Sequence, residues 1–91
     1  MNDENRVKLL NMMDSVYQTP SKLEQYIDDI PPLLTELVST APEGLQGMAK
    51  MIGVHFSHAI KLKDTKVQHF ELESGLIKYQ TYLRKLSLIN R

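Results

Sequence analysis

The sequence predicts an all-α fold, a small bundle of about five helices that self-associates. Two observations predict it. Apolar residues recur at helical spacing along most of the chain, and helix-start signals and prolines divide these stretches into three short helices followed by two longer antiparallel ones. The clearest stretch is a C-terminal seam whose gaps alternate between four and three residues, which is typical of helices that pack on other helices. This seam consists of Leu72, Leu76, Tyr79, Leu83 and Leu86.

Length and composition indicate one domain, residues 1–91, with a modest core. A chain of 91 residues hides only roughly 60–65% of the surface that its unfolded form exposes. It has no cysteine, so neither disulfides nor a thiolate metal site can stabilise it. The polar, acidic start and the lack of an apolar run near 18 residues predict neither a signal peptide nor a membrane span. We therefore expect a cytoplasmic protein stabilised by helix packing or by a partner.

The charges are distributed unevenly, although the formal net charge is zero. Residues 1–60 carry eight acidic and four basic side chains, whereas residues 61–91 carry seven basic and three acidic ones. These two parts should attract each other, within one chain or between copies.

The first predicted helix runs from Asp3 or Glu4 to Tyr17. Acidic residues occupy its first turn, where the helix dipole favours them. It ends before Thr19, because a residue that precedes proline is disfavoured in the helical region. Its expected apolar face consists of Val7, Leu10, Met13, Val16 and Tyr17, widened by Leu9 and Met12.

Two short helices are predicted next. Ser21 and Glu24 have the spacing of a capping box, which would start a helix over roughly residues 22–28. Pro31 and Pro32 fit the first turn of a third helix that ends near residue 38, because a first turn needs no amide donors. Its expected buried side is Leu33, Leu34, Leu37 and Val38. The same cap spacing recurs at Thr40 and Glu43.

The fourth helix has a stripe of apolar residues and a parallel strip of small ones. The stripe is Leu45, Met48, Ile52, Ala59 and Leu62, with Met51, Phe56 and Ile60 beside it. The small strip is Ala49, Gly53 and Ser57, where another backbone could approach closely.

The boundary between the fourth and fifth helices allows two architectures. A continuous rod over residues 41–89 would be roughly 70 Å long, too long for a compact domain of this size. The apolar phase also changes here, and Asp64 is a suitable cap for a helix that begins at Thr65. We therefore predict a turn near residues 62–65.

Three histidines are the only metal-site candidates. His55 and His58 project from nearly the same face, and His69 could approach them if the chain doubles back. Three imidazoles, or two with a carboxylate, could hold zinc or nickel. Ordinary packing and surface roles are the favoured interpretation, because zinc-enzyme helices place two histidines four residues apart around a glutamate. No nucleophile elbow or phosphate-binding loop is present, so we expect a non-enzymatic protein without a cofactor.

A basic strip with an aromatic residue gives an alternative function. Lys78, Tyr82 and Lys85 share a helix face, and Arg84 lies farther round. An anionic nucleotide or a nucleic acid could bind there, with tyrosine stacked on a base. The balanced overall charge favours an ordinary solvated face instead.

A protein partner is the leading expectation. Four residues fall partly outside the main seam, so the last helix is apolar on more than one side: Phe70, Ile77, Leu88 and Ile89. That second side needs a neighbour, either the short helices or another molecule. We expect the main seam, Leu72, Leu76, Tyr79, Leu83 and Leu86, to carry the contact with a partner or with a second copy, although the sequence leaves open whether it is internal or intermolecular. We expect an adaptor, inhibitor or chaperone-like accessory factor, of the kind common among bacterial and phage regulatory proteins, that occupies a surface of a larger protein through its C-terminal helix.

Overall fold

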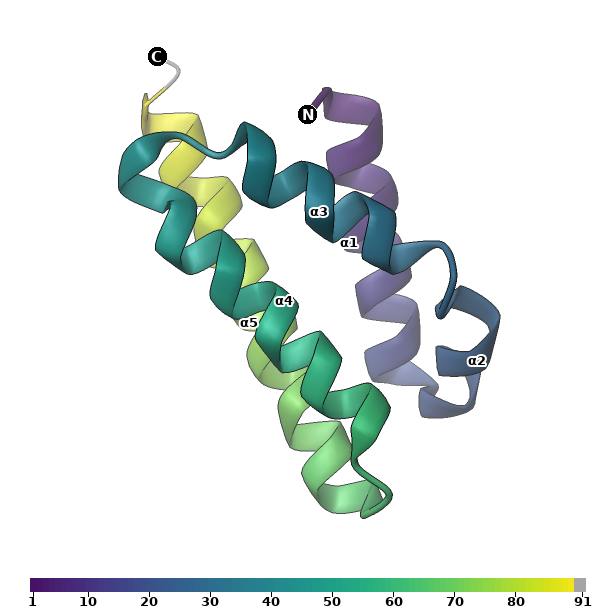
Figure 1. Cartoon of the computed structure of the whole chain (residues 1–91). Coiled ribbons are helices and arrows are strands. Elements are labelled where there is room, and N and C mark those ends of the chain that lie inside the picture. The colour runs from purple at the N-terminus through teal and green to yellow at the C-terminus, as the bar shows by residue number, and fades with distance from the viewer. Residues whose placement is uncertain (90–91) are drawn as a thin grey trace.

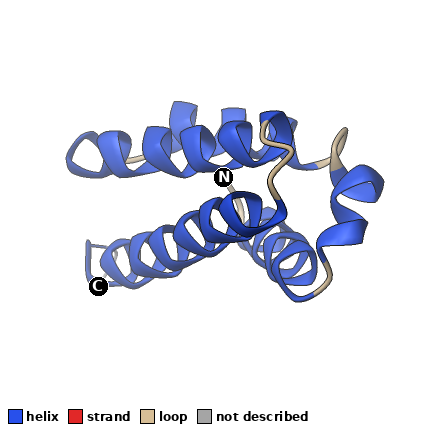
Figure 2. Cartoon of the chain, turned by 90° about the horizontal axis from the view of Figure 1, so that it is seen from below, coloured by secondary structure: helices blue, strands red, loops and turns tan. Residues whose placement is uncertain are grey.

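The chain forms helices joined by short loops (Figure 2). The computed structural model describes residues 1–89, and within them it has five α-helices, two short 3₁₀-helices and no strand, which confirms the all-α prediction. The elements run in the order α1 (Asp3–Gln18), η1 (Pro20–Lys22), α2 (Leu23–Tyr26), α3 (Ile30–Thr40), η2 (Glu43–Leu45), α4 (Gln46–Lys61) and α5 (Thr65–Ile89). The predicted division into three short and two longer helices is wrong for α1, because α1 and α4 each have 16 residues.

The helices gather around one apolar core. α4 and α5 lie side by side, α3 crosses toward α1, and α1 packs against α5 (Figure 1). The molecule measures 40 × 21 × 19 Å, so α5, at about 37 Å for 25 residues, spans its longest dimension. All five α-helices contribute buried apolar side chains, and among the described residues no polar or charged residue is fully buried. Apolar burial therefore holds the fold together.

α1 forms as predicted, and all of its buried residues belong to the predicted apolar face, but that face is narrower than expected. The side chain of Asn2 accepts a hydrogen bond from the Asn5 amide at 2.8 Å, which caps the helix. Val7, expected on the apolar face, is 55% exposed. The side of α1 that carries Val7 points away from α5 and α3, because α1 contacts these helices through residues farther round its surface. The buried residues are Leu9, Met12, Met13 and Val16.

The starts of the short helices differ from the predicted capping boxes. Residues 20–22 form a 3₁₀ turn after Thr19, and neither η1 nor α2 has a side-chain cap, so Ser21 and Glu24 do not form a box. The hydroxyl of Thr40 donates instead to the carbonyl of Glu36 at 2.7 Å, inside the preceding helix. A hydroxyl can bond to the previous turn as readily as to the next one, and here the previous turn is closer.

α3 confirms the proline prediction. Pro31 and Pro32 lie in its first turn, where their missing amides leave no helical bond unmade. The helix continues to Thr40, beyond the expected end near residue 38. Leu34 and Leu37 are buried as expected together with Ile30, whereas Leu33 and Val38 are only partly buried.

The chain breaks between α4 and α5, as predicted. α4 ends at Lys61 and α5 begins at Thr65, so the continuous rod is wrong. One carboxylate oxygen of Asp64 accepts from the amides of Lys66 at 2.9 Å and Val67 at 3.1 Å, which makes Asp64 the cap of α5.

The close approach of α4 and α5 does not use Gly53 of the predicted small strip, although Ala49 of that strip is buried. Gly53 has open space where a Cβ would be, whereas a Cβ added at Gly75 of α5 would lie 3.3 Å from the Cβ of His55. The missing side chain at Gly75 therefore sets how closely the two helices pack. Within α4, the buried residues are Ala49, Ile52, Phe56 and Ala59, while the expected Met51 and Ile60 are exposed.

Candidate functional site

The C-terminal seam packs inside the chain. Four of its five residues are buried and the fifth, Leu83, is partly buried. Tyr79 is fully buried, and its hydroxyl donates to the backbone carbonyl of Arg6 at 2.9 Å, which ties α5 to α1. Burial also raises the pKa of Tyr79, because a phenolate would lose its solvation there. The question left open by the sequence is answered for these residues: the seam lies against the chain's own helices.

The opposite side of α5 is uncovered. We call it the outward strip, and its residues are Val67, Phe70, Ile77 and Leu88. Ile89 is also exposed, but at 100° per residue it lies about 20° from the buried Tyr82, nearer to the core side. Each residue of the strip is between 43% and 63% exposed, and Phe70 is the most exposed. The alternative in which the short helices cover this side is therefore wrong, because α1 and α4 pack against the other side of α5.

The core side of α5 is wider than the seam, and this changes the predicted basic strip. Tyr82 is only 2% exposed, and its ring lies 6.2 Å from the ring of Tyr79. Burial raises the pKa of Tyr82 as well. Tyr82 cannot stack on a base from this position, so the predicted basic-aromatic strip for nucleotides is wrong in its aromatic part.

The basic residues of α5 border the outward strip instead. At 100° per residue, Lys78 and Lys85 lie along one edge of the strip and Arg84 along the other. Arg84 and Lys85 are exposed, and Lys78 is partly buried. Arg91, which the sequence adds to the basic C-terminal part, lies outside the described residues. The structure therefore gives α5 an apolar strip with lysines along one edge and with Arg84, on the same side as Glu73, along the other.

A histidine and a glutamate join α4 to α5. Nδ1 of His55 lies 2.6 Å from Oε2 of Glu71, and both side chains are 15% exposed. His58 reaches the other carboxylate oxygen only at 3.9 Å and is more open to solvent. The hydrogen bond from His55, more than any other contact, lowers the pKa of Glu71 below its ordinary value. Among the described side chains, the buried Nε2 of His55 has no hydrogen-bond partner.

The third histidine lies elsewhere. His69 stacks on the ring of Tyr17, with ring centroids 4.7 Å apart, so it does not approach His55 and His58. Within residues 1–89 no three histidine, aspartate or glutamate side chains are arranged to hold a metal ion. The three-imidazole site considered from the sequence is therefore wrong, because α5 turns His69 toward α1 instead of α4.

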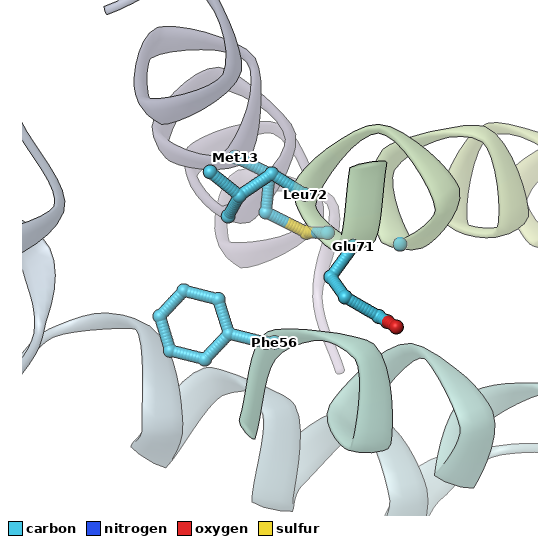
Figure 3. Close-up of a pocket in the computed structure, with 5 residues that line it drawn as sticks. Met13, Phe56, Glu71 and Leu72 are labelled. Atoms are coloured by element: carbon cyan, nitrogen blue, oxygen red, sulfur yellow. The ribbon is translucent and has the colours of Figure 1, made fainter. Parts of the chain in front are cut away.

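A small cavity lies where α1, α4 and α5 meet (Figure 3). Side chains of Met13, Phe56, Glu71 and Leu72 converge on it, together with Gly75, and its volume is about 10 Å³. This is space for about one water molecule, so the cavity cannot hold a substrate. A larger, open groove of about 510 Å³ lies between α3 and α4, and its lining carries no charged side chain.

The comparisons with known proteins add no family. The chain was compared with protein-family models, with curated proteins and with solved structures, and none matched. Among the described helices, none combines the length and apolar character that a membrane crossing requires. On the surface of the described residues, the outward strip of α5 carries the two most exposed large apolar side chains, Phe70 and Leu88.

Proposed function

We propose that this protein is a small, non-enzymatic interaction protein that occupies a surface of a larger protein through the outward strip of α5. In this proposal α4 and α5 form an antiparallel pair, the main seam fixes α5 in place, and the chain self-associates. It would act as an adaptor, an inhibitor or a chaperone-like accessory factor.

The exposure of the outward strip supports this proposal above all. Phe70, Ile77 and Leu88 recur on one side of α5 over about 27 Å of helix, and each is more than half exposed. Scattered apolar residues are normal on protein surfaces, but an aligned row with charged edges is typical of an interaction site.

The charges define the kind of protein partner. Lys78 and Lys85 border one edge of the strip and Arg84 the other, so the partner should offer an apolar groove or helix face with acidic residues beside it. The buried anchor would be Phe70 or Ile77, because large side chains near the centre of an interface carry most of the binding free energy.

The test compares matched surface variants. Four proteins would each be immobilised and used to capture binding proteins: wild type, Phe70→Ser, Ile77→Ser and the control Val7→Ser. Val7 is 55% exposed on α1, so its replacement removes a similar apolar side chain from another surface. Any protein lost with Ile77→Ser but kept with Val7→Ser would then be purified, and its dissociation constant measured against each variant.

We expect Ile77→Ser to weaken binding of that purified protein by about tenfold or more, as the loss of an interface anchor does. Val7→Ser should bind like wild type, and circular dichroism should show all variants folded. The proposal fails if purified components bind equally well with and without Ile77, or if no direct binding remains after purification.

A further inference from the structure

The outward side of α5 contains a second seam with the same spacing as the first. Its gaps are four, three, four, three and four residues, and its members are Phe70, Ser74, Ile77, Thr81, Arg84 and Leu88. It begins two residues before the main seam, which places it on nearly the opposite side of the helix. Its apolar members, Phe70, Ile77 and Leu88, are more than half exposed.

The order of large and small side chains along this second seam allows two copies of it to pack against each other in opposite directions. When two copies of α5 run in opposite directions with Tyr79 at the centre, Phe70 meets Leu88 of the other copy. Ser74 then meets Arg84, and Ile77 meets Thr81. Each small residue faces a large one, which is the condition for filling the space between two helices.

On the edge of the seam that carries Glu73, the charges favour the same arrangement, whereas on the other edge the two Lys78 side chains come nearly level with each other. Arg84 lies toward the edge of the seam that also carries Glu73, so reversed copies place Arg84 beside Glu73 of the other copy, once at each end. Copies running in the same direction would instead place the two Arg84 side chains opposite each other, which is unfavourable. Among the described residues of its own chain, Arg84 makes one side-chain hydrogen bond, a long one to Thr81 at 3.3 Å, so it can turn toward a partner.

We infer that a second copy of this chain covers the outward strip, with the two α5 helices antiparallel and centred near Tyr79. The inference rests on the proposed function only in using the same face of α5, and it names the occupant of that face in the free protein. Because the pairing is two-fold symmetric, it closes as a dimer and leaves no second strip open. A protein partner would then have to displace the second copy.

Disulfide trapping tests the direction of the helices, and the chain suits it because it has no cysteine. Two single variants are made, Phe70→Cys and Leu88→Cys, both at exposed positions. In an antiparallel pair, residue 70 meets residue 88 of the other copy, while two identical positions are about 27 Å apart. Oxidation should therefore give a covalent dimer from the mixture at several times the yield of either variant alone.

Two results would overturn the arrangement. Efficient cross-linking of Phe70→Cys to itself would show helices running in the same direction. A yield in the mixture no higher than that of the separate variants, together with a monomer mass by light scattering at millimolar concentration, would show that the second seam does not pair.

Charge exchange tests the contact between Arg84 and Glu73 without touching the core. Arg84→Glu alone, and Glu73→Arg alone, should each raise the dissociation constant of the dimer about tenfold, and the double variant should recover most of the loss. Lys63→Glu is the matched control, because it makes the same charge change as Arg84→Glu at an exposed position outside the helix. Equal weakening by the control, or no recovery in the double variant, would contradict the proposed pairing.

These experiments separate the two proposals. If disulfide trapping succeeds while purified proteins bind independently of Ile77, dimerisation stands and the proposed function fails. If wild type and Arg84→Glu both have the mass of a monomer but Ile77→Ser still abolishes binding of a purified protein, partner binding stands and the dimer fails.

Discussion

The contact between His55 and Glu71 links α4 to α5 through two side chains, beside the hydrogen bond that the Gln68 side-chain amide donates to the Ala59 carbonyl at 2.8 Å. The carboxylate accepts from an imidazole nitrogen at 2.6 Å in a site that is mostly removed from water. Replacing either partner would leave the other partly buried without its bond, which is more costly than losing an exposed pair. His58 is too distant, at 3.9 Å, to take over the role of His55.

Glu71→Gln should destabilise the protein in a pH-dependent way. The folded-state pKa of Glu71 is lowered, so its charge contributes stability that is fully present above the unfolded-state pKa, about 4.3, and is lost as the pH falls through the folded value. Urea unfolding should therefore show a lower midpoint for Glu71→Gln at pH 7 and nearly equal midpoints for both proteins well below pH 4. A difference that is unchanged at low pH would contradict an electrostatic role.

At the scale of elements, the packing of α4 on α5 is set by Gly75. The Cβ of His55 is fixed by the α4 backbone and cannot rotate away from a new methyl group at Gly75, 3.3 Å distant. The two helices would have to separate slightly, because the cavity beside Gly75, at about 10 Å³, offers little space for a methyl group.

Two of the helical glycines, Gly53 and Gly75, give a matched pair of variants. Gly53→Ala should raise the free energy of unfolding by about 1 kcal/mol, because alanine favours the helix and its methyl group meets nothing within 4 Å. Gly75→Ala has the same helical advantage but must move α4, so it should be less stable than Gly53→Ala. Urea denaturation measures both, and a Gly75→Ala gain equal to that of Gly53→Ala would show that the contact is not tight.

At the scale of the molecule, one core should produce one unfolding transition. The buried residues of α1, α3, α4 and α5 form a single cluster, and small single-core domains usually unfold in one step. The chain has no tryptophan, and Tyr79 and Tyr82 lie in the core, so tyrosine fluorescence reports on core packing. It should change at the same urea concentration as helical circular dichroism, whereas separate midpoints would indicate that a helix detaches first.

The limits of prediction from the sequence follow from the range of each interaction. Asp64 and the prolines of α3 were predictable, because caps and first-turn prolines depend on neighbouring residues. The burial of Tyr82 and the exposure of Val7 depend on where α1 and α4 meet α5, which helical spacing alone does not fix. The burial of Tyr82 could have been suspected from its position three residues after Tyr79, which places it at the margin of the seam.

The candidate site also has residues that the sequence predicted and residues that it did not. Phe70, Ile77, Leu88 and Ile89 were recognised as apolar residues outside the seam, and they are exposed. Val67 was missed because it stands one turn before the others, next to the cap. The partner of His55 was missed because Glu71 lies 16 residues away in the sequence, and only the turn at residues 62–64 brings the two together.

The two-sided nature of α5 constrains how this sequence can evolve. In the proposed assembly, substitutions on one side of the helix change the stability of the core, and those on the other change the fit of the neighbouring molecule. Neutral drift is then confined to a few exposed polar positions such as Gln80 and Ser87. Related proteins that kept the fold but changed partners would differ mainly at the second seam, while the seam two residues away stayed the same.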